Sequence, residues 1–291
     1  MAKQGEIDYL RNLEESNLLH ALRKPFTGAE TPRYIVEIGT VMSLLPPPPA
    51  RLLDIGCGTG WTSVFFARTG YEVVGVDIAP DMIRYANEKR EQEKLANLRF
   101  QVCDYEEMAF DNEFDGVVFY DSLHHAVNEE LAIRCAYRAL KPHGVCVAAE
   151  PGKGHQDAPH SLAAVRKFNV TEKDMPPEKI IALGRQAGFG RSDIFPHAFD
   201  LHGLVFTENN GLDPRTAKQP VHPNPLRRLL GKLKSAIRSY WADPEKARFL
   251  KIAQSGGFPR VVGLLSNVQY SGLVRLVKEP PCETVALRSA A

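Results

Sequence analysis

The alternation of short apolar runs with helical patterns between residues 51 and 150 is the feature that most constrains the fold of this chain. Apolar runs at 51–55, 72–77, 98–103, 114–120 and 145–150 are separated mainly by helical patterns at 61–69, 81–94 and 129–140. Strands connected through helices pair in parallel with right-handed crossovers. The pattern therefore predicts a doubly wound α/β sheet, whose ligands bind at the carboxyl ends of the strands.

The first loop of this sheet is rich in glycine. Gly56, Gly58 and Gly60 follow a strand directly and precede a helix. Glycine is needed where the backbone turns sharply and touches a ligand. The spacing is Gly-x-Gly-x-Gly, whereas a dinucleotide-binding loop has Gly-x-Gly-x-x-Gly. Asp54, two residues before the first glycine, favours a cationic ligand over a pyrophosphate.

Two further carboxylates stand where strands end. Asp77 closes the second strand, and an acid at this position can accept hydrogen bonds from both ribose hydroxyls of an adenosine. Asp104 follows the third strand and could bind the adenine amino group. The pattern indicates a site for a cationic adenosine derivative.

These segments together resemble the class I S-adenosylmethionine-dependent methyltransferases. The matching stretches keep the family's order: LDIGCGTG (53–60), VVGVDIAPDMI (73–83), CDYEEM (103–108), FDGVVFYDSLHH (114–125) and LKPHGVCVAAEP (140–151). The resemblance implies S-adenosylmethionine as cofactor and a Rossmann-like, seven-stranded, mostly parallel sheet. The implied cofactor-binding residues are Asp54, Gly56, Cys57, Gly58, Gly60, Asp77, Ile78, Met82, Asp104, Tyr105 and Asp121.

The flanking segments have weaker patterns. An amphipathic helix is expected over residues 1–25 and a second over 33–45, and together they suggest an N-terminal helical lid over residues 1–49. Residues 50–291 would form the methyltransferase domain, with a cofactor half at 51–151 and an acceptor-side insertion at about 202–270. A helix over 176–188 and strands over 194–201 and 273–277 complete the prediction.

The acceptor side is predicted from two adjacent histidines. His124 and His125 follow the fourth strand, and Glu150 ends the neighbouring fifth strand. An imidazole can take the proton of a hydroxyl acceptor near neutral pH, and a carboxylate can orient that imidazole. The arrangement resembles small-molecule and sugar O-methyltransferases, which implies His124 or His125 as general base and Glu150 as its partner.

Other acceptors stay open at this stage. C- and N-methylating relatives also carry a histidine here, so a quinone or lipid-like acceptor is an alternative, and a noncatalytic cofactor-binding subunit in glycan assembly is another. A weaker resemblance to bacterial methyltransferases of glycan-biosynthesis clusters favours a saccharide acceptor and would place His155, His160 and Lys173 on the acceptor side. The sequence has no compact cluster of carboxylates that would indicate a magnesium site, so no metal is expected.

Composition limits location and partners. The chain has 291 residues with 36 Lys and Arg against 35 Asp and Glu, so no overall field attracts DNA. Five cysteines without a Cys-x-x-Cys pair and an N-terminus unlike a signal peptide predict a cytoplasmic protein. A basic stretch at 226–241 is interpreted either as a cap helix with a solvated face or as a peripheral membrane contact.

Overall fold

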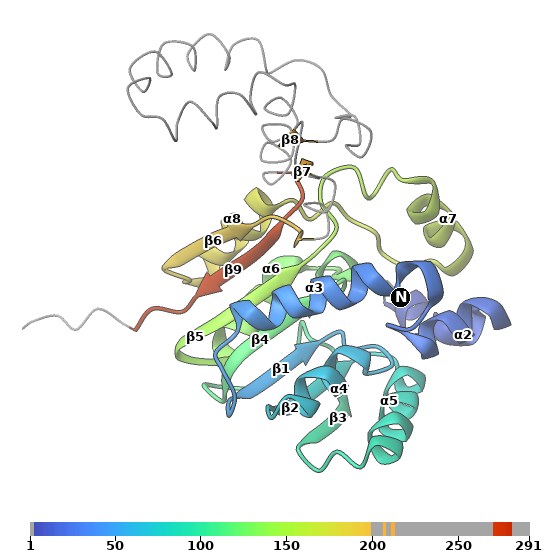
Figure 1. Cartoon of the computed structure of the whole chain (residues 1–291), viewed down its shortest axis with the longest axis horizontal. Helices are drawn as coiled ribbons and strands as arrows, with labels where there is room; N and C mark the ends of the chain where they lie inside the picture. Colours follow the sequence, from blue (N-terminus) through green and yellow to red (C-terminus); the bar gives the residue numbers. More distant parts are fainter. Residues whose placement is uncertain (1–2, 199–205, 208–210, 213–269, 281–291) are drawn as a thin grey trace, which may run out of the picture. The chain divides into compact units, whose positions relative to one another are not determined.

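The computed structural model describes residues 3–198, 206–207, 211–212 and 270–280 (Figure 1). The chain divides into two compact units, residues 1–195 with 270–291, and residues 196–269. Of the second unit the structure describes residues 196–198 and a short antiparallel pair, β7 (Phe206–Thr207) and β8 (Gly211–Leu212). The basic stretch at 226–241 lies outside the described residues, and most of the predicted insertion does as well.

A seven-stranded sheet forms the centre of the first unit, as the sequence predicts. Its strand order is β3-β2-β1-β4-β5-β9-β6. The strands are β1 (Arg51–Ile55), β2 (Glu72–Asp77), β3 (Leu98–Val102), β4 (Phe114–Tyr120), β5 (Leu140–Ala149), β6 (Arg191–Phe195) and β9 (Leu273–Val277). The first five pair in parallel, and β9 runs antiparallel to both β5 and β6. The order reverses between β1 and β4, where a doubly wound sheet opens a crevice for ligands.

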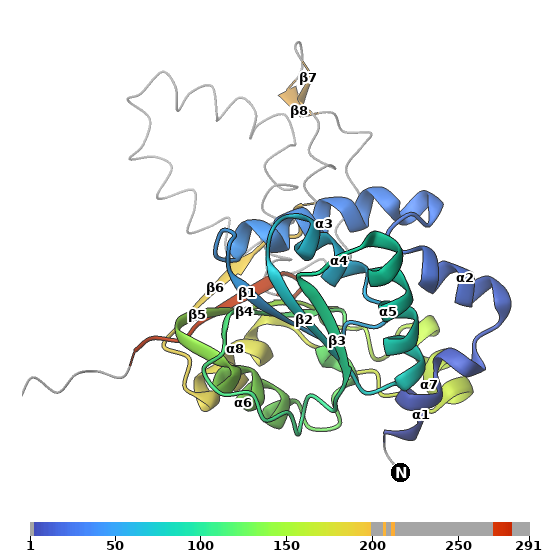
Figure 2. The ribbon, with the colours of Figure 1, turned by 90° about the horizontal axis from the view of Figure 1, so that it is seen from below.

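Helices cover both faces of the sheet. Figure 2 shows α3 and α4 over one face and α6 and α8 over the other. The helices of this unit are α1 (Gln4–Asp8), α2 (Glu15–Arg23), α3 (Thr31–Leu44), α4 (Trp61–Arg68), α5 (Pro80–Glu93), α6 (Glu129–Ala139), α7 (Pro159–Phe168) and α8 (Pro177–Ala187). None of the described helices has the length and apolar character needed to cross a bilayer.

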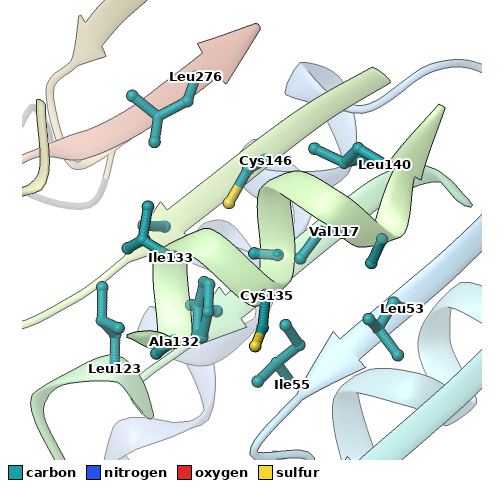
Figure 3. Close-up of a cluster of buried hydrophobic side chains, with 14 of the residues drawn as sticks. Leu53, Ile55, Val117, Leu123, Ala132, Ile133, Cys135, Leu140, Cys146 and Leu276 are labelled. Atoms are coloured by element: carbon teal, nitrogen blue, oxygen red, sulfur yellow. The ribbon is translucent and has the colours of Figure 1, made fainter. Parts of the chain in front are cut away.

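Two apolar layers stabilise the unit because alternate residues of each strand point to opposite faces. On one face Leu53, Ile55 and Val117 pack under α6 and α8, and Figure 3 shows Ile133 and Leu276 facing this cluster. On the other face Leu52 and the neighbouring strands pack against α3 and α4. The layers hold the strand ends, and hence the loops that follow them, in fixed positions.

The N-terminal segment differs from its prediction. Instead of one helix over 1–25, α1 is followed by a 3-10 turn (Leu10–Asn12) and then by α2. The backbone becomes extended at Leu13, which ends the turn. Tyr9 stacks edge-on against Phe168, with ring centroids 5.1 Å apart. The helical periodicity continues through the break, so tertiary contacts, not local preference, divide this segment.

Three other differences lie after residue 139. β5 begins at Leu140, earlier than predicted, because it continues directly from α6. Helix α7 is not predicted from the sequence, because its polar first turn weakens the periodic signal. Strand β6 occupies Arg191–Phe195 rather than 194–201. The predicted strand at 273–277 is confirmed.

Candidate active site

A cavity of about 860 Å³ lies at the carboxyl ends of the central strands. One end is lined by the loop after β1 and by Asp77, and the other by His124 and His125. The N-terminal segment and α7 contribute the remaining wall, including Tyr9, Lys24 and Phe168. All of these residues belong to the first unit. The predicted cofactor end and acceptor end are thus parts of one cavity.

The glycine loop is held open by backbone geometry. Gly56 and Gly58 have φ values of +68° and +52°, in the region that side chains disfavour. A Cβ on Gly56 would lie 2.5 Å from Ser122 Cβ, whereas the only heavy atom near a Cβ on Gly58 is Met82 Sδ at 4.0 Å. Gly56 therefore permits packing beneath the loop, while Gly58 leaves bare backbone at the cavity.

Asp77 joins the glycine loop to the second strand. Its carboxylate accepts hydrogen bonds from the amides of Gly58 and Ala79, each at 2.9 Å. Burial raises the pKa of this carboxyl above its usual range, although both amide hydrogen bonds lower it. Asp77 lines the cavity beside Ile78 and Met82. The carboxylate is fixed in place while facing the space where a ribose would lie.

The predicted adenine edge is partly occupied by the N-terminal segment. Asp104 forms an ion pair with Lys3, which also lies 3.0 Å from Glu106. Asp104 further accepts a hydrogen bond from the amide of Glu106 at 3.0 Å. The Tyr105 hydroxyl donates to the Ser122 carbonyl oxygen at 3.1 Å. Asp104 and Tyr105 both line the cavity, so their placement agrees with a role at the adenine.

Three of the predicted cofactor-binding residues, Asp54, Gly60 and Cys57, have surroundings that differ from those of the others. Asp54 is 1% exposed and accepts hydrogen bonds from the hydroxyls of Thr62 and Ser63 at 2.6 and 2.5 Å. It does not line the cavity, so any effect on a ligand passes through α4 and the loop. Gly60 also lies outside the cavity wall, where a Cβ would lie 2.6 Å from Phe100. Cys57 lines the cavity, and burial raises the pKa of its thiol well above the usual value.

Glu150 organises the loop after β4. Its carboxylate accepts hydrogen bonds from the amides of Ser122, Leu123 and His124 at 3.0, 2.8 and 3.2 Å. It also bonds Nδ1 of His124 at 2.8 Å. Burial alone would lower the pKa of His124, but the hydrogen bond and the charge of Glu150 raise it to about 9. Glu150 itself is outside the cavity wall and acts as the partner of His124, as expected.

His125 has a different environment from its neighbour. Its Nδ1 lies 2.7 Å from the Thr171 carbonyl oxygen and 3.7 Å from Glu6 of α1. Burial, together with the charge of His124, lowers the pKa of His125 to about 4. Because Nδ1 donates to a carbonyl, Nε2 of a neutral His125 carries the lone pair. The two histidines thus differ in charge, which the sequence could not indicate.

Glu172 is a site residue that the sequence analysis missed. Its carboxylate lies 3.6 Å from Nε2 of His124 and 2.6 Å from Nε2 of His155. His155 and His160 line the cavity, whereas Lys173 binds Glu129 at 2.6 Å and is outside its wall. Glu6 also reaches this end and accepts a hydrogen bond from the amide of Thr171 at 2.7 Å. Neither acid lies in a motif, and only the approach of α1 and residues 170–172 brings them to the site.

Asp121 begins the loop between the two ends of the cavity. It has a φ of +53° and lines the wall, and its amide donates to the Ala149 carbonyl oxygen at 2.9 Å. This backbone hydrogen bond holds Asp121 at the end of β4, between the glycine loop and the histidines. This position suits either a cofactor contact, as expected, or a contact with an acceptor.

The residues present fit an adenosine-containing sulfonium ligand. Gly58 offers backbone without a side chain, and Asp77 offers a half-buried carboxylate at the end of β2. Ile78 and Met82 add apolar wall beside them. Asp104 and Tyr105 complete the same end of the cavity.

Comparison with known proteins assigns this region to a family. Residues 53–148 match the methyltransferase domain family. Residues 53–148 therefore form a methyltransferase domain, which is built on the seven-stranded, mostly parallel sheet.

Two of the relatives that the chain resembles are named as ubiquinone biosynthesis O-methyltransferases. The chain is 36% identical over 98 residues to a mitochondrial ubiquinone biosynthesis O-methyltransferase of Rattus norvegicus, covering 32% of this chain and 28% of the relative. It is 27% identical over 155 residues to a ubiquinone biosynthesis O-methyltransferase of Psychrobacter arcticus, covering 50% and 60%. The chain thus spans less than two thirds of the length of either relative.

A solved structure supports the fold. Phosphoethanolamine N-methyltransferase 2 of Haemonchus contortus, in complex with S-adenosyl-L-methionine, aligns with a TM-score of 0.58 at 18% identity. The alignment covers 96% of this chain and 60% of that chain. At this identity the likeness concerns the fold alone.

Proposed function

We propose that this protein is an S-adenosylmethionine-dependent methyltransferase that O-methylates a sugar or another small hydroxylated acceptor. The observation that carries the proposal is the single cavity that joins the Gly58–Asp77 end to the His124–His125 end. Transfer of a methyl group requires donor and acceptor to meet in line, and a protein achieves this mainly by holding both in one enclosed space.

The cofactor end has the groups that this donor needs. When bound, S-adenosylmethionine supplies a methyl group on a positively charged sulfur. Asp77 would accept hydrogen bonds from the ribose hydroxyls, and Asp104 with Tyr105 would contact the adenine. Ile78 and Met82 would pack against the ring. The backbone at Gly58 would pass beside the methionine portion, with Asp121 at the border of the two ends.

The acceptor end is built around His124, His125 and Glu150. We infer that the two histidines bind the reacting hydroxyl and lower the cost of removing its proton. Glu150 positions His124 through a 2.8 Å bond, and Thr171 positions His125 through a 2.7 Å bond. Lid residues such as Tyr9 and Lys24 line the opposite wall and would limit access of water.

The names of the relatives support a hydroxyl as the acceptor group, and the polar lining of the cavity supports a hydroxylated small molecule as the acceptor. Two relatives are named as O-methyltransferases, which agrees with a hydroxyl acceptor. Polar side chains of His20, Lys24 and His160 line the cavity and suit a hydroxylated molecule better than a lipid tail. A reducing cytoplasm agrees with the unpaired thiols of the described cysteines, which are Cys57, Cys103, Cys135 and Cys146. Peripheral membrane contact through 226–241 stays a prediction.

The test combines cofactor binding with an acceptor screen. The whole chain is titrated with S-adenosylmethionine by calorimetry, and Asp77→Ala is expected to weaken binding by at least about tenfold, since a charge-assisted hydrogen bond is worth about 1.5–3 kcal/mol. Methyl transfer is then measured with saccharides, phenols and quinones. His125→Ala is expected to reduce turnover strongly while binding of the cofactor persists.

The rival functions give different results. C-methylation of a quinone predicts methylated carbon and tolerance of His125→Ala. A noncatalytic binding subunit predicts cofactor binding without transfer to any acceptor. Absence of cofactor binding by the unaltered chain would refute the proposal.

A further inference from the structure

We propose that His124, His125 and Glu172 bind a divalent transition-metal ion at the acceptor end of the cavity. One ligand atom of each residue lies within 4.8 Å of the others. Ligands at about 2.0–2.2 Å from a common ion stand about 3–4 Å apart, so small side-chain rotations suffice to close the set. This inference rests on the proposed function and deepens it, because the ion would hold the acceptor hydroxyl.

The two imidazole rings make the kind of hydrogen bond that orients metal-bound histidines. Nδ1 of His124 bonds the Glu150 carboxylate at 2.8 Å, and Nδ1 of His125 bonds the Thr171 carbonyl oxygen at 2.7 Å. A ligating histidine usually gives its second nitrogen to a carboxylate or a backbone carbonyl, which fixes the ring and its tautomer. In both rings this leaves Nε2 as the nitrogen available to an ion, and Nε2 of His124 lies 3.6 Å from Glu172.

The charge around the cluster also favours a cation. Glu6, Glu150 and Glu172 converge on the two histidines, with exposed side-chain fractions of 16%, 0% and 10%. Within the described part of the chain, no Lys or Arg forms an ion pair with any of these three acids. Buried carboxylates are stable only when they are paired or bound to metal. Among the described residues, the side chains that form ion pairs with these acids are all histidines.

The ligand set favours one class of ion. Two imidazoles and one carboxylate suit Zn²⁺ and its first-row neighbours, whereas Mg²⁺ prefers oxygen ligands alone. His155, whose Nε2 lies 2.6 Å from Glu172, stands next to the set and can orient the carboxylate or join it. Three protein ligands leave a position open, and a hydroxyl bound there is polarised by the ion.

The experiment titrates the chelator-treated full chain with Zn²⁺ and, separately, with S-adenosylmethionine. We expect one Zn²⁺ to bind per chain, and we expect His125→Gln and Glu172→Gln each to weaken it by at least about tenfold. His160→Gln is the matched control, because His160 lines the same cavity outside the cluster. Retained binding of S-adenosylmethionine verifies that each variant is folded.

A second measurement does not depend on the variants. Co²⁺ added to the chelator-treated chain is expected to give visible absorption bands of a four- or five-coordinate site, and Zn²⁺ is expected to abolish them. The proposed site would be overturned if the chain bound no Zn²⁺ or if Co²⁺ gave no such bands. Equal Zn²⁺ affinity in His125→Gln, Glu172→Gln and the unaltered chain would overturn it as well. Methyl transfer by a chain that binds no Zn²⁺ would leave the proposed function intact, whereas Zn²⁺ binding without methyl transfer would refute only that function.

Discussion

Asp54 shows how a single residue can combine a motif position with a structural task. Its carboxylate is 1% exposed and receives the hydroxyls of Thr62 and Ser63 at the start of α4. Burial raises its pKa from 3.8 to about 6, although both hydrogen bonds lower it. The folded chain therefore keeps this proton to a higher pH than the unfolded chain does.

This difference predicts a pH-dependent stability. Between pH 4 and 6 the folded state binds more protons at Asp54 than the unfolded state, so its contribution to the free energy of unfolding falls as pH rises. The loss amounts to about 3 kcal/mol at most, at 1.36 kcal/mol per pKa unit. In Asp54→Asn this dependence should disappear. Denaturant unfolding at a series of pH values without cofactor checks it, and parallel curves for both proteins would contradict it.

At the scale of elements, the antiparallel strand β9 decides how the sheet is closed. It lies between β5 and β6, and α8 packs over it through Gly184. A Cβ on Gly184 would lie 2.8 and 2.9 Å from the two terminal methyl carbons of Leu276. Leu276 is 1% exposed, so it has little room to move. The glycine is required by the close approach of helix and strand.

Gly184→Ala is therefore expected to destabilise the fold. Overpacking a core costs about 1–3 kcal/mol, which exceeds the gain of about 1 kcal/mol from replacing a helical glycine. Gly39→Ala in α3 is the matched control, because no atom of the described part of the chain lies within 4 Å of its Cβ position. The control should raise the free energy of unfolding while Gly184→Ala lowers it. Equal shifts in both variants would show that this contact does not limit packing.

At the scale of the whole described unit, the N-terminal segment is fastened across the cavity by charge. Lys3 pairs with Asp104, and Arg11 pairs with Asp81 of α5. Lys167 of α7 pairs with Glu14 from the other side. These contacts join a segment before the sheet to both the cofactor end and the acceptor end.

Lys3→Ala combined with Arg11→Ala should loosen this attachment. Partly exposed ion pairs are worth about 0.2–1 kcal/mol each, so we expect the loss of both to weaken binding of S-adenosylmethionine by about 2- to 30-fold. The change should lie mainly in the dissociation rate, measured by stopped-flow fluorescence or surface plasmon resonance. Lys94→Ala is the control. Lys94 follows the last residue of α5 and has a left-handed backbone conformation, and its substitution should leave the dissociation rate of S-adenosylmethionine unchanged. An unaltered rate in the double variant would show that these pairs do not retain the ligand.

The sequence by itself determined the central sheet, because its strands and helices have distinct periodicities and its loops carry Gly56, Gly58 and Asp77 at fixed spacing. It also predicted that Glu150 would partner His124 or His125, since these residues follow adjacent strands, and the structure selects His124. Only the tertiary structure decided the rest of the acceptor end. Glu6 and Glu172 are 166 positions apart and meet there because α1 packs beside residues 168–171. Local periodicity has no information about such contacts, and the opposite pKa shifts of His124 and His125 depend on them.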